Sequence, residues 1–241
     1  MNTKHYDPHG QALTDYFAGD TAASIAVYGD DGGLLVDVPL SLFFRTPAEF
    51  PRMEHAAIEL CRGRVLEFGA GTGCHSLALQ ERGLDICAID FLPVCADIAR
   101  RRGVRDVRVA DIYTFDDGPF DTLLSLMNGL GVVPTLSELE PFLSMLRRRV
   151  RSNGQLLIDS VDLRKTDRFR ARYGTVDGTA PFHAELRQQL EYKGRRGPVF
   201  SQLMADPQTL FDHAIRAGWK GRVVEQDETG RYLAQLVSQD G

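Results

Sequence analysis

The sequence predicts an α/β protein with a seven-stranded, mostly parallel, doubly wound sheet and a C-terminal antiparallel hairpin. From residue 64 onwards short apolar runs alternate with helix-like segments, the pattern of parallel strands joined by helices. The first run leads into the glycine-rich turn Gly69-Ala70-Gly71-Thr72-Gly73. The last two runs flank a short polar turn at 227–230, as two strands of a hairpin do.

The strands and helices follow in order from local composition. We expect strands at 64–68, 85–89, 107–110, 122–126, 155–160, 221–226 and 231–237. A helix is expected from about 48 to 61, because Phe50, Met53, Ala57 and Leu60 recur at helical spacing. Further helices should follow the glycine turn and cover about 136–150. The last helix should run from Asp206-Pro207, an N-cap followed by proline, to Gly218.

Two stretches fall outside this alternation. The N-terminal stretch, residues 1–62, is expected to form a helical cap, with a turn at 28–33 and a short extended piece at 34–38. Residues 162–205 interrupt the strand–helix rhythm and should form an insertion with a β-hairpin, 184–192 and 198–204, around a five-residue loop. With a core at 63–161 and a closing helix and hairpin at 206–241, the 241 residues form one predicted domain.

Bulk composition excludes several classes. The chain is 43% hydrophobic and 25% charged, and it contains no apolar run of the length that spans a membrane. The N-terminus lacks the apolar region of a signal peptide, so a cytoplasmic location without membrane partners is expected. A net charge of −5 argues against a nucleic-acid partner. The arginine runs 100–102 and 147–149 are expected to be solvated helix ends.

The cysteine pattern indicates no metal site. The four cysteines form no C-x-x-C pair and have no histidine at ligand spacing. Cys74 and His75 directly follow the glycine turn and are expected to line a pocket wall rather than to act as a ligand or a nucleophile.

The glycine turn carries the strongest functional signal. A strand that turns through glycines into a helix N-terminus presents bare backbone N–H groups to a ligand. The dinucleotide spacing G-x-G-x-x-G would require a glycine at Cys74, whereas the glycine stands one position earlier, at Gly73. Counted from Glu67, the pattern is E-x-G-x-G-x-G. It resembles motif I of the class I (Rossmann-like) S-adenosylmethionine (SAM)-dependent methyltransferases, and this resemblance covers residues 63–239 apart from the insertion.

The resemblance implies SAM as cofactor, S-adenosylhomocysteine (SAH) as product and a set of donor-binding residues. Asp90 would accept hydrogen bonds from the ribose hydroxyls. Asp90 could instead be a helix N-cap, Asp111 a turn residue, and Arg45, which could pair with the methionine carboxylate or an acidic substrate, a surface arginine. The implied donor-binding residues are Glu67, Gly69, Ala70, Gly71, Thr72, Gly73, Asp90, Phe91 on the adenine, Asp111 and Ile112 at the adenine edge, Met127 and Asn128 near the sulfonium, and Arg45.

The acceptor side is less determined, and no catalytic base is assigned. The catalytic candidates are Asn128, Asp159 and His183, and the candidates for substrate binding are Tyr16, Tyr28, Asp159 and Asp162. Asp159 follows the fifth strand and could hold or deprotonate an amine or a hydroxyl, or it could be a satisfied turn carboxylate. His183 could be an exposed loop histidine.

Several family signatures are missing after the fourth strand. Asn128-Gly129-Leu130-Gly131 stands where adenine- and glutamine-modifying enzymes carry an Asn/Asp-Pro-Pro-Tyr tetrad. The paired glutamates of protein arginine methyltransferases and the acidic metal set of catechol-type enzymes are also missing. What remains is methyl transfer to a nitrogen, oxygen or carbon of a small molecule, in specialised metabolism for example. The alternatives are a peptide or protein acceptor and a non-catalytic SAM-binding partner subunit. A nicotinamide oxidoreductase is disfavoured by the glycine spacing, and the oligomeric state stays open.

Overall fold

A computed structural model describes residues 3–173 and 180–239 of the chain. Residues 174–179, which belong to the predicted insertion, lie outside the described residues, as do the terminal pairs 1–2 and 240–241. The chain divides into two compact units. The first unit comprises Met1–Phe50, Leu66–Phe115 and Leu186–Ser201, and the second comprises Pro51–Val65, Asp116–Glu185 and Gln202–Gly241.

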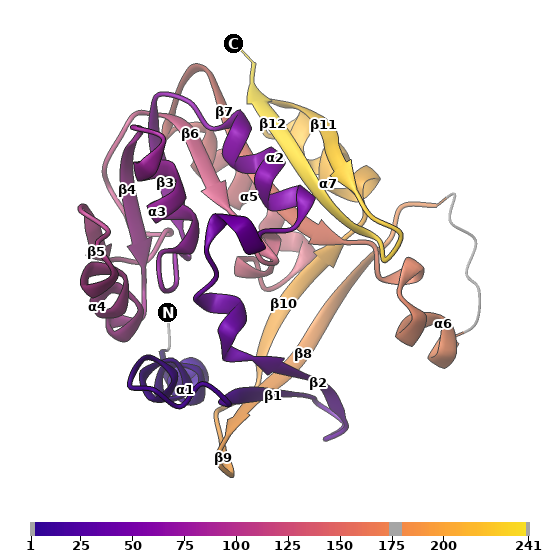
Figure 1. Cartoon of the computed structure of the whole chain (residues 1–241). Coiled ribbons are helices and arrows are strands. Elements are labelled where there is room, and N and C mark those ends of the chain that lie inside the picture. The colour runs from indigo at the N-terminus through magenta and orange to yellow at the C-terminus, as the bar shows by residue number, and fades with distance from the viewer. Residues whose placement is uncertain (1–2, 174–179, 240–241) are drawn as a thin grey trace. The chain divides into compact units, whose positions relative to one another are not determined.

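The first unit contains the glycine turn and most of the N-terminal stretch. Its helices are η1 (Thr3–Tyr6), α1 (Asp7–Phe17), η2 (Leu40–Phe43), η3 (Pro47–Glu49), α3 (Cys74–Glu81) and α4 (Pro93–Arg102). Its strands are β1 (Ser24–Gly29), β2 (Leu34–Pro39), most of β3 (Arg64–Phe68), β4 (Asp85–Asp90), β5 (Val107–Val109), most of β8 (His183–Tyr192) and β9 (Arg195–Arg196). Within this unit α1 packs on α4 and on β1 (Figure 1).

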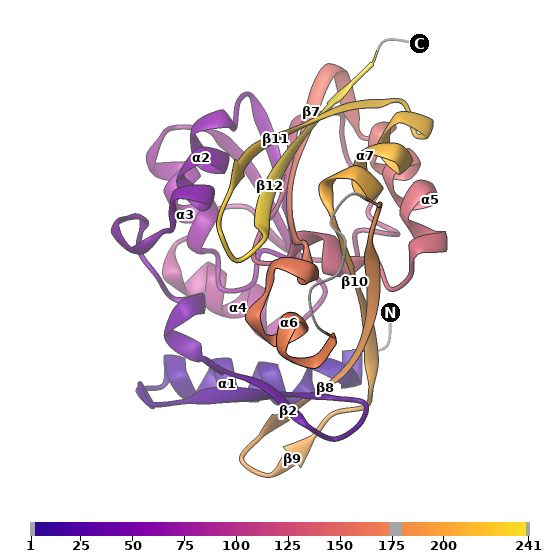
Figure 2. The same ribbon diagram turned by 90° about the vertical axis from the view of Figure 1, so that its right-hand side faces the viewer.

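The second unit contains α2 and most of the regular structure after residue 116. Its helices are α2 (Arg52–Leu60), η4 (Gly129–Val132), α5 (Leu136–Arg147), η5 (Leu163–Lys165), α6 (Asp167–Tyr173) and α7 (Pro207–Arg216). Its strands are β6 (Phe120–Ser125), β7 (Val150–Val161), most of β10 (Phe200–Ala205), β11 (Trp219–Gln226) and β12 (Arg231–Ser238). Here α5 and α7 lie side by side (Figure 2).

The strand order confirms the predicted fold class. Seven strands are hydrogen-bonded in the order β11-β12-β7-β6-β3-β4-β5. β4 pairs with β5 and β6 with β7 in parallel, whereas β12 is antiparallel to both β7 and β11. The predicted closing hairpin is therefore present. The last helix also begins as predicted, because the Asp206 carboxylate accepts the backbone N–H of Thr209 at 2.8 Å.

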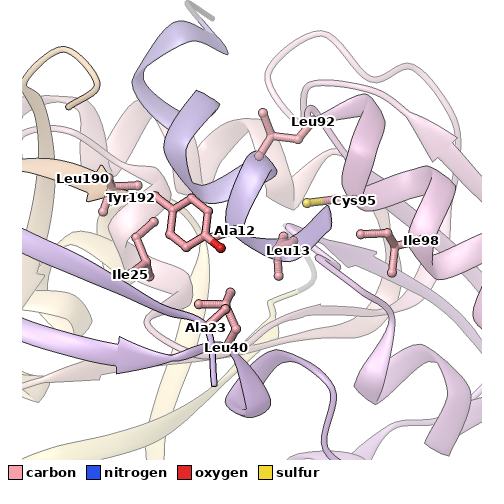
Figure 3. Packing of buried hydrophobic residues seen from close by; sticks show 10 residues of the cluster. All are labelled: Ala12, Leu13, Ala23, Ile25, Leu40, Leu92, Cys95, Ile98, Leu190 and Tyr192. Carbon is pink, nitrogen blue, oxygen red and sulfur yellow. The ribbon is translucent and has the colours of Figure 1, made fainter. Parts of the chain in front are cut away.

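The predicted inserted hairpin is present as the neighbouring strands β8 and β10, and the expected extended piece is β2, but their union with β1 in a second sheet, in the order β10-β8-β1-β2, was not predicted from the sequence. Its β1–β2 hairpin lies in the stretch expected to be a helical cap, and β8 of the expected insertion pairs antiparallel with β1. A shared core explains this pairing. Ile25 of β1, Leu190 and Tyr192 of β8, and Leu13 of α1 are buried together with residues of α4 (Figure 3). Strands 160 residues apart in sequence form one layer because each buries a face against α1.

Two elements differ from prediction for local reasons. The helix expected from about residue 48 begins at Arg52, because Pro51 holds the preceding Phe50 in an extended conformation with ψ of 137°. β7 begins at Val150, although the strand was expected to begin at residue 155. Its pairing with β6 jumps from Val150 to Gln155, with Asn153 at φ 60°, so the polar residues form a bulge inside the strand.

In the described ranges, no helix combines the length and the apolar character that a membrane crossing needs.

Candidate functional site

The glycine loop, residues 69–73, connects β3 to α3 in the first unit. Gly73 is the N-cap of α3 with φ +83°, and a Cβ there would lie 2.6 Å from Cγ2 of Val104. Gly71 has φ +54°, and a Cβ there would meet no described atom within 4 Å. Glycine is therefore required at these two positions for different reasons. Gly73 allows close packing inside the protein, whereas Gly71 keeps open the space in front of the loop.

Asp90, at the end of β4, holds the glycine loop. One carboxylate oxygen accepts the backbone N–H of Gly71 at 2.9 Å, and the other accepts that of Leu92 at 2.8 Å. Burial raises the pKa of Asp90 to about 6, against the lowering effect of these two hydrogen bonds. Asp90 thus joins the loop to the start of α4, and the ribose role stays a prediction.

Glu67 is satisfied inside the protein. Its side chain is 3% exposed, and it accepts a hydrogen bond from the hydroxyl of Ser76. Its other oxygen lies 3.2 Å from Nδ1 of His75. The carboxylate therefore anchors the first turn of α3, directly after the glycine loop. His75 and Cys74 are both buried, and their role as pocket-wall residues stays a prediction.

Four further predicted donor residues, Phe91, Asp111, Ile112 and Arg45, belong to the first unit, whereas Met127 and Asn128 belong to the second. Phe91 is half-buried, and its ring meets the ring of Tyr6 edge-on at 5.1 Å. Asp111 accepts the backbone N–H of Tyr113 at 3.0 Å in the turn after β5, and Ile112 is buried. Arg45 donates from Nε to the carbonyl of Leu42 at 2.9 Å. Asp111 therefore makes the turn contact that was its alternative reading, and a role toward adenine remains a prediction.

A second loop, here called the Asn128 turn (residues 127–129), follows β6 in the second unit. Met127 and Asn128 have φ of 62° and 72°, a left-handed conformation that is uncommon for residues other than glycine. Asp159 of β7 holds this turn, because its carboxylate accepts the backbone N–H groups of Asn128 at 2.9 Å and Gly129 at 2.6 Å. Asp159 is 3% exposed, and burial raises its pKa.

A cleft of about 300 Å³ lies beside the Asn128 turn. Its lining comes from residues of the second unit alone: Asn128, Asp159, Ser160, Val161, Leu163, Thr166, Met204, Thr229 and Arg231. Arg231 is half exposed, and its Nη2 lies 3.4 Å from a carboxylate oxygen of Asp159. The Oδ1 atom of Asn128 is buried without a hydrogen-bond partner. Hydroxyls, an amide, a carboxylate and a guanidinium thus share a small cleft with apolar side chains.

The remaining acceptor-side candidates belong to both units and make other contacts. Tyr16 stacks on Phe44 with ring centroids 4.6 Å apart, and Arg196 lies 3.9 Å over the ring of Tyr28; both pairs belong to the first unit. In the second unit, His183 is exposed at the start of β8. Both carboxylate oxygens of the buried Asp162 accept hydrogen bonds from Arg164, at 2.9 and 3.0 Å. Asn128 and Asp159 are the candidates that the structure brings together.

Two arginines at these sites were missed from the sequence. Arg231 begins β12 and lines the cleft, where the hairpin return places it beside Asp159. Arg102 was expected to be solvated, yet its guanidinium donates to the carbonyl oxygen of Thr72 in the glycine loop at 2.9 Å. A run of three arginines at a helix end gives no signal that one of them folds back.

The described residues contain no group of three histidine, cysteine, aspartate or glutamate side chains that could hold a metal ion. The glycine loop, in contrast, fits a nucleoside-type cofactor. Gly71 keeps open a space that a Cβ would fill, and the buried Asp90 carboxylate lies directly behind it. Backbone donors and a carboxylate suit the amino-acid and ribose groups of SAM.

Comparison with known proteins agrees with this site. The family described as "Methyltransferase domain" matches residues 66–158. A SAM-dependent methyltransferase from Bacteroides fragilis, solved with SAH, is 31% identical over 98% of this chain and 97% of its own, with a TM-score of 0.85.

Two further proteins match less of the chain. Demethylmenaquinone methyltransferase from Clavibacter sepedonicus is 32% identical over 35% of this chain and 37% of its own length, so the match spans little more than a third of that relative. A sugar N-methyltransferase from Streptoalloteichus shares the fold, with 18% identity, coverage of 83% and 92% of the two chains, and a TM-score of 0.55. The end-to-end similarity to the Bacteroides enzyme, together with the glycine loop, places this chain in the class I SAM-dependent methyltransferase family.

Proposed function

We propose that the protein transfers a methyl group from SAM to a small-molecule acceptor that binds in the cleft beside the Asn128 turn. The size and lining of this cleft carry the proposal. At about 300 Å³ it is at the small end of ligand pockets, and it combines polar groups with the apolar side chains of Val161, Leu163 and Met204. A small acceptor fits such a volume, whereas a folded protein surface does not enter it.

On the donor side we assign the backbone of the glycine loop to the methionine portion of SAM and Asp90 to the ribose. SAM supplies an electrophilic methyl group on a sulfonium. The chain's task is then to hold that group and exclude water, because orientation accounts for much of the acceleration in such displacements. A carboxylate that is buried and held by the Gly71 N–H is already fixed before ligand arrives.

On the acceptor side we assign Asn128 to orienting the acceptor and Asp159 to holding the turn. The unpartnered Oδ1 of Asn128 is suited to a donor such as an amine or a hydroxyl, once the amide turns toward it. Asp159 already accepts two backbone N–H groups, which favours a positioning role over that of a general base. An amine acceptor that arrives uncharged needs no enzyme base before the methyl transfer.

The donor half is tested by calorimetry with SAM, SAH and NAD in turn. Micromolar binding of both sulfur ligands and no binding of NAD is the expected result, with the affinity lost in Asp90→Ala. Binding of NAD in preference to SAH would contradict the donor assignment. This test needs no knowledge of the acceptor.

The acceptor half is tested by release of SAH with a panel of amino sugars, aryl and alkyl amines, phenols and short peptides. Amines enter the panel because the relative from Streptoalloteichus is named a sugar N-methyltransferase. Turnover of a small molecule that Asn128→Ala weakens at unchanged SAH affinity is expected. Turnover of peptides alone would favour the peptide alternative, and SAH binding without any turnover would favour a non-catalytic SAM-binding subunit. A cytoplasmic location and the absence of a nucleic-acid partner remain part of this proposal.

A further inference from the structure

Arg102, the last residue of α4, contacts the glycine loop through its guanidinium group. Its Nη1 donates to the carbonyl oxygen of Thr72 at 2.9 Å and lies 2.7 Å from the Thr72 hydroxyl. The same nitrogen lies 3.3 Å from the sulfur of Cys74, the first residue of α3. The guanidinium therefore contacts both the end of the loop and the start of the helix that follows it.

The same guanidinium binds the chain segment after η2. Nη2 donates to the carbonyl of Phe44 at 3.2 Å, and Nη1 reaches that of Phe43 at 3.4 Å. The carbonyl of Phe43 also accepts from the hydroxyl of Thr72 and, at 2.9 Å, from the thiol of Cys74. The planar guanidinium also lies 5.2 Å over the ring of Phe44.

This geometry needs arginine. A guanidinium presents several N–H groups in a fixed plane, so that it can join carbonyls of two chain segments at once. A lysine ammonium carries the same charge but is a single point on a flexible stem. The neighbouring Arg101 differs, because it is 62% exposed, lies 3.8 Å from Asp97 and covers the ring of Phe17. The two adjacent arginines thus form a natural pair of test residue and control.

We propose that Arg102 is a positioning residue for the methyl donor. It fixes Thr72 against the Phe43–Phe44 backbone, and so holds the glycine loop in its ligand-binding shape before SAM arrives. The proposal rests on the assignment of the glycine loop to the donor. Preorganisation of a loop raises affinity by removing the ordering that binding would otherwise require. Loss of the planar guanidinium contacts should therefore weaken donor binding. The fold should stay intact, because the core under the loop is built from Ala96, Ala99 and Val104.

The first measurement is the SAH affinity of R102K by calorimetry, with R101K as the matched control. R102K keeps the positive charge and removes the planar fork. We expect its affinity for SAH to fall by about tenfold at an unchanged melting temperature, and R101K to match the wild type. R102Q serves as a second variant if R102K does not fold.

The second measurement reads the loop without any ligand. Labelling of Cys74 by iodoacetamide, followed residue by residue with mass spectrometry, reports opening of the Arg102 contacts. Cys87 and Cys95, both 1% exposed in the same unit, report general unfolding. We expect Cys74 to label about tenfold faster in R102K, with Cys87 and Cys95 unchanged and with SAH slowing the reaction.

The outcomes separate the two proposals. Unchanged SAH affinity in folded R102K would overturn the positioning role, and so would equal acceleration of all three cysteines. Wild-type protein that does not bind SAH would overturn the donor assignment and, with it, this inference. Faster Cys74 labelling in that case would describe only a structural contact.

Discussion

The glycine loop and the Asn128 turn solve the same problem in two ways. Each follows a strand of the main sheet, each takes left-handed backbone conformations, and each has N–H groups held by a buried carboxylate, Asp90 or Asp159. In the glycine loop every left-handed residue is a glycine, so the shape carries no steric cost. In the Asn128 turn, Met127 and Asn128 take that shape themselves. Both turns have tertiary partners, but only the Asn128 turn needs its partner to offset an unfavourable backbone conformation.

The largest effect should come from removing that partner. Asp159→Ala leaves the N–H groups of Asn128 and Gly129 buried without an acceptor, in a turn that already has unfavourable dihedral angles. We expect the free energy of unfolding to fall by about 3 kcal/mol. Urea denaturation measures the change. Glu228→Ala, at an exposed site in the C-terminal hairpin, is the control and should change stability by less than about 0.5 kcal/mol. An effect of that small size in Asp159→Ala would show that the turn holds itself.

Alanine substitutions at two glycines of the loop should differ in their effects on stability and on SAH binding. Gly73→Ala places a Cβ 2.6 Å from Val104 and should lower the free energy of unfolding by about 2 kcal/mol. Gly71→Ala adds a Cβ in open space and should cost only about 1 kcal/mol for the left-handed backbone.

For SAH binding the order should be reversed, with the larger loss of affinity in Gly71→Ala. SAH affinity should fall by about tenfold or more in Gly71→Ala, because the added methyl occupies the space in front of the loop. Thermal unfolding and calorimetry on both variants test this prediction. Normal SAH binding by Gly71→Ala would place the donor elsewhere.

The pH dependence of donor binding should follow Asp90. Its pKa of about 6 means that the carboxyl group is protonated below that pH and can no longer accept two ribose hydroxyls. SAH affinity should therefore rise as the pH increases through about 6, and Asp90→Asn should remove this dependence.

The contribution of Asp90 to stability should change with pH in the opposite direction to donor binding. The native state binds the Asp90 proton more tightly than the unfolded chain does. This residue's contribution to stability therefore falls as the pH rises from about 4 to about 6. Calorimetry and urea denaturation across this range measure the two curves. A flat affinity curve in the wild type would mean that Asp90 only holds Gly71 and Leu92.

The smallest effect on stability should come from Asn128→Gly. Glycine accepts φ of 72° without strain, and the substitution removes a buried oxygen that has no partner. We expect unfolding free energy to stay within about 1 kcal/mol of the wild type. Acceptor turnover should fall nonetheless, measured by SAH release with whichever panel member the wild type methylates. A variant with full turnover would remove Asn128 from the acceptor site.

The sequence by itself determined the fold class and the identity of the glycine loop. Alternating strands and helices, the spacing of Gly69, Gly71 and Gly73, and Asp206-Pro207 are local signals, and they depend on dihedral preferences and periodicity within a few residues. The sequence also predicted that Asp90 and Asp159 lie at or near strand ends, because the apolar runs show where the strands end.

The tertiary structure alone decided what those side chains contact. The β1–β8 pairing, the fold-back of Arg102 onto Thr72, and Arg231 beside Asp159 join residues distant in sequence. Such contacts depend on how buried faces pack together, and no local pattern encodes them. The left-handed Asn128 turn belongs to the same class, since its backbone is held by a carboxylate from another strand.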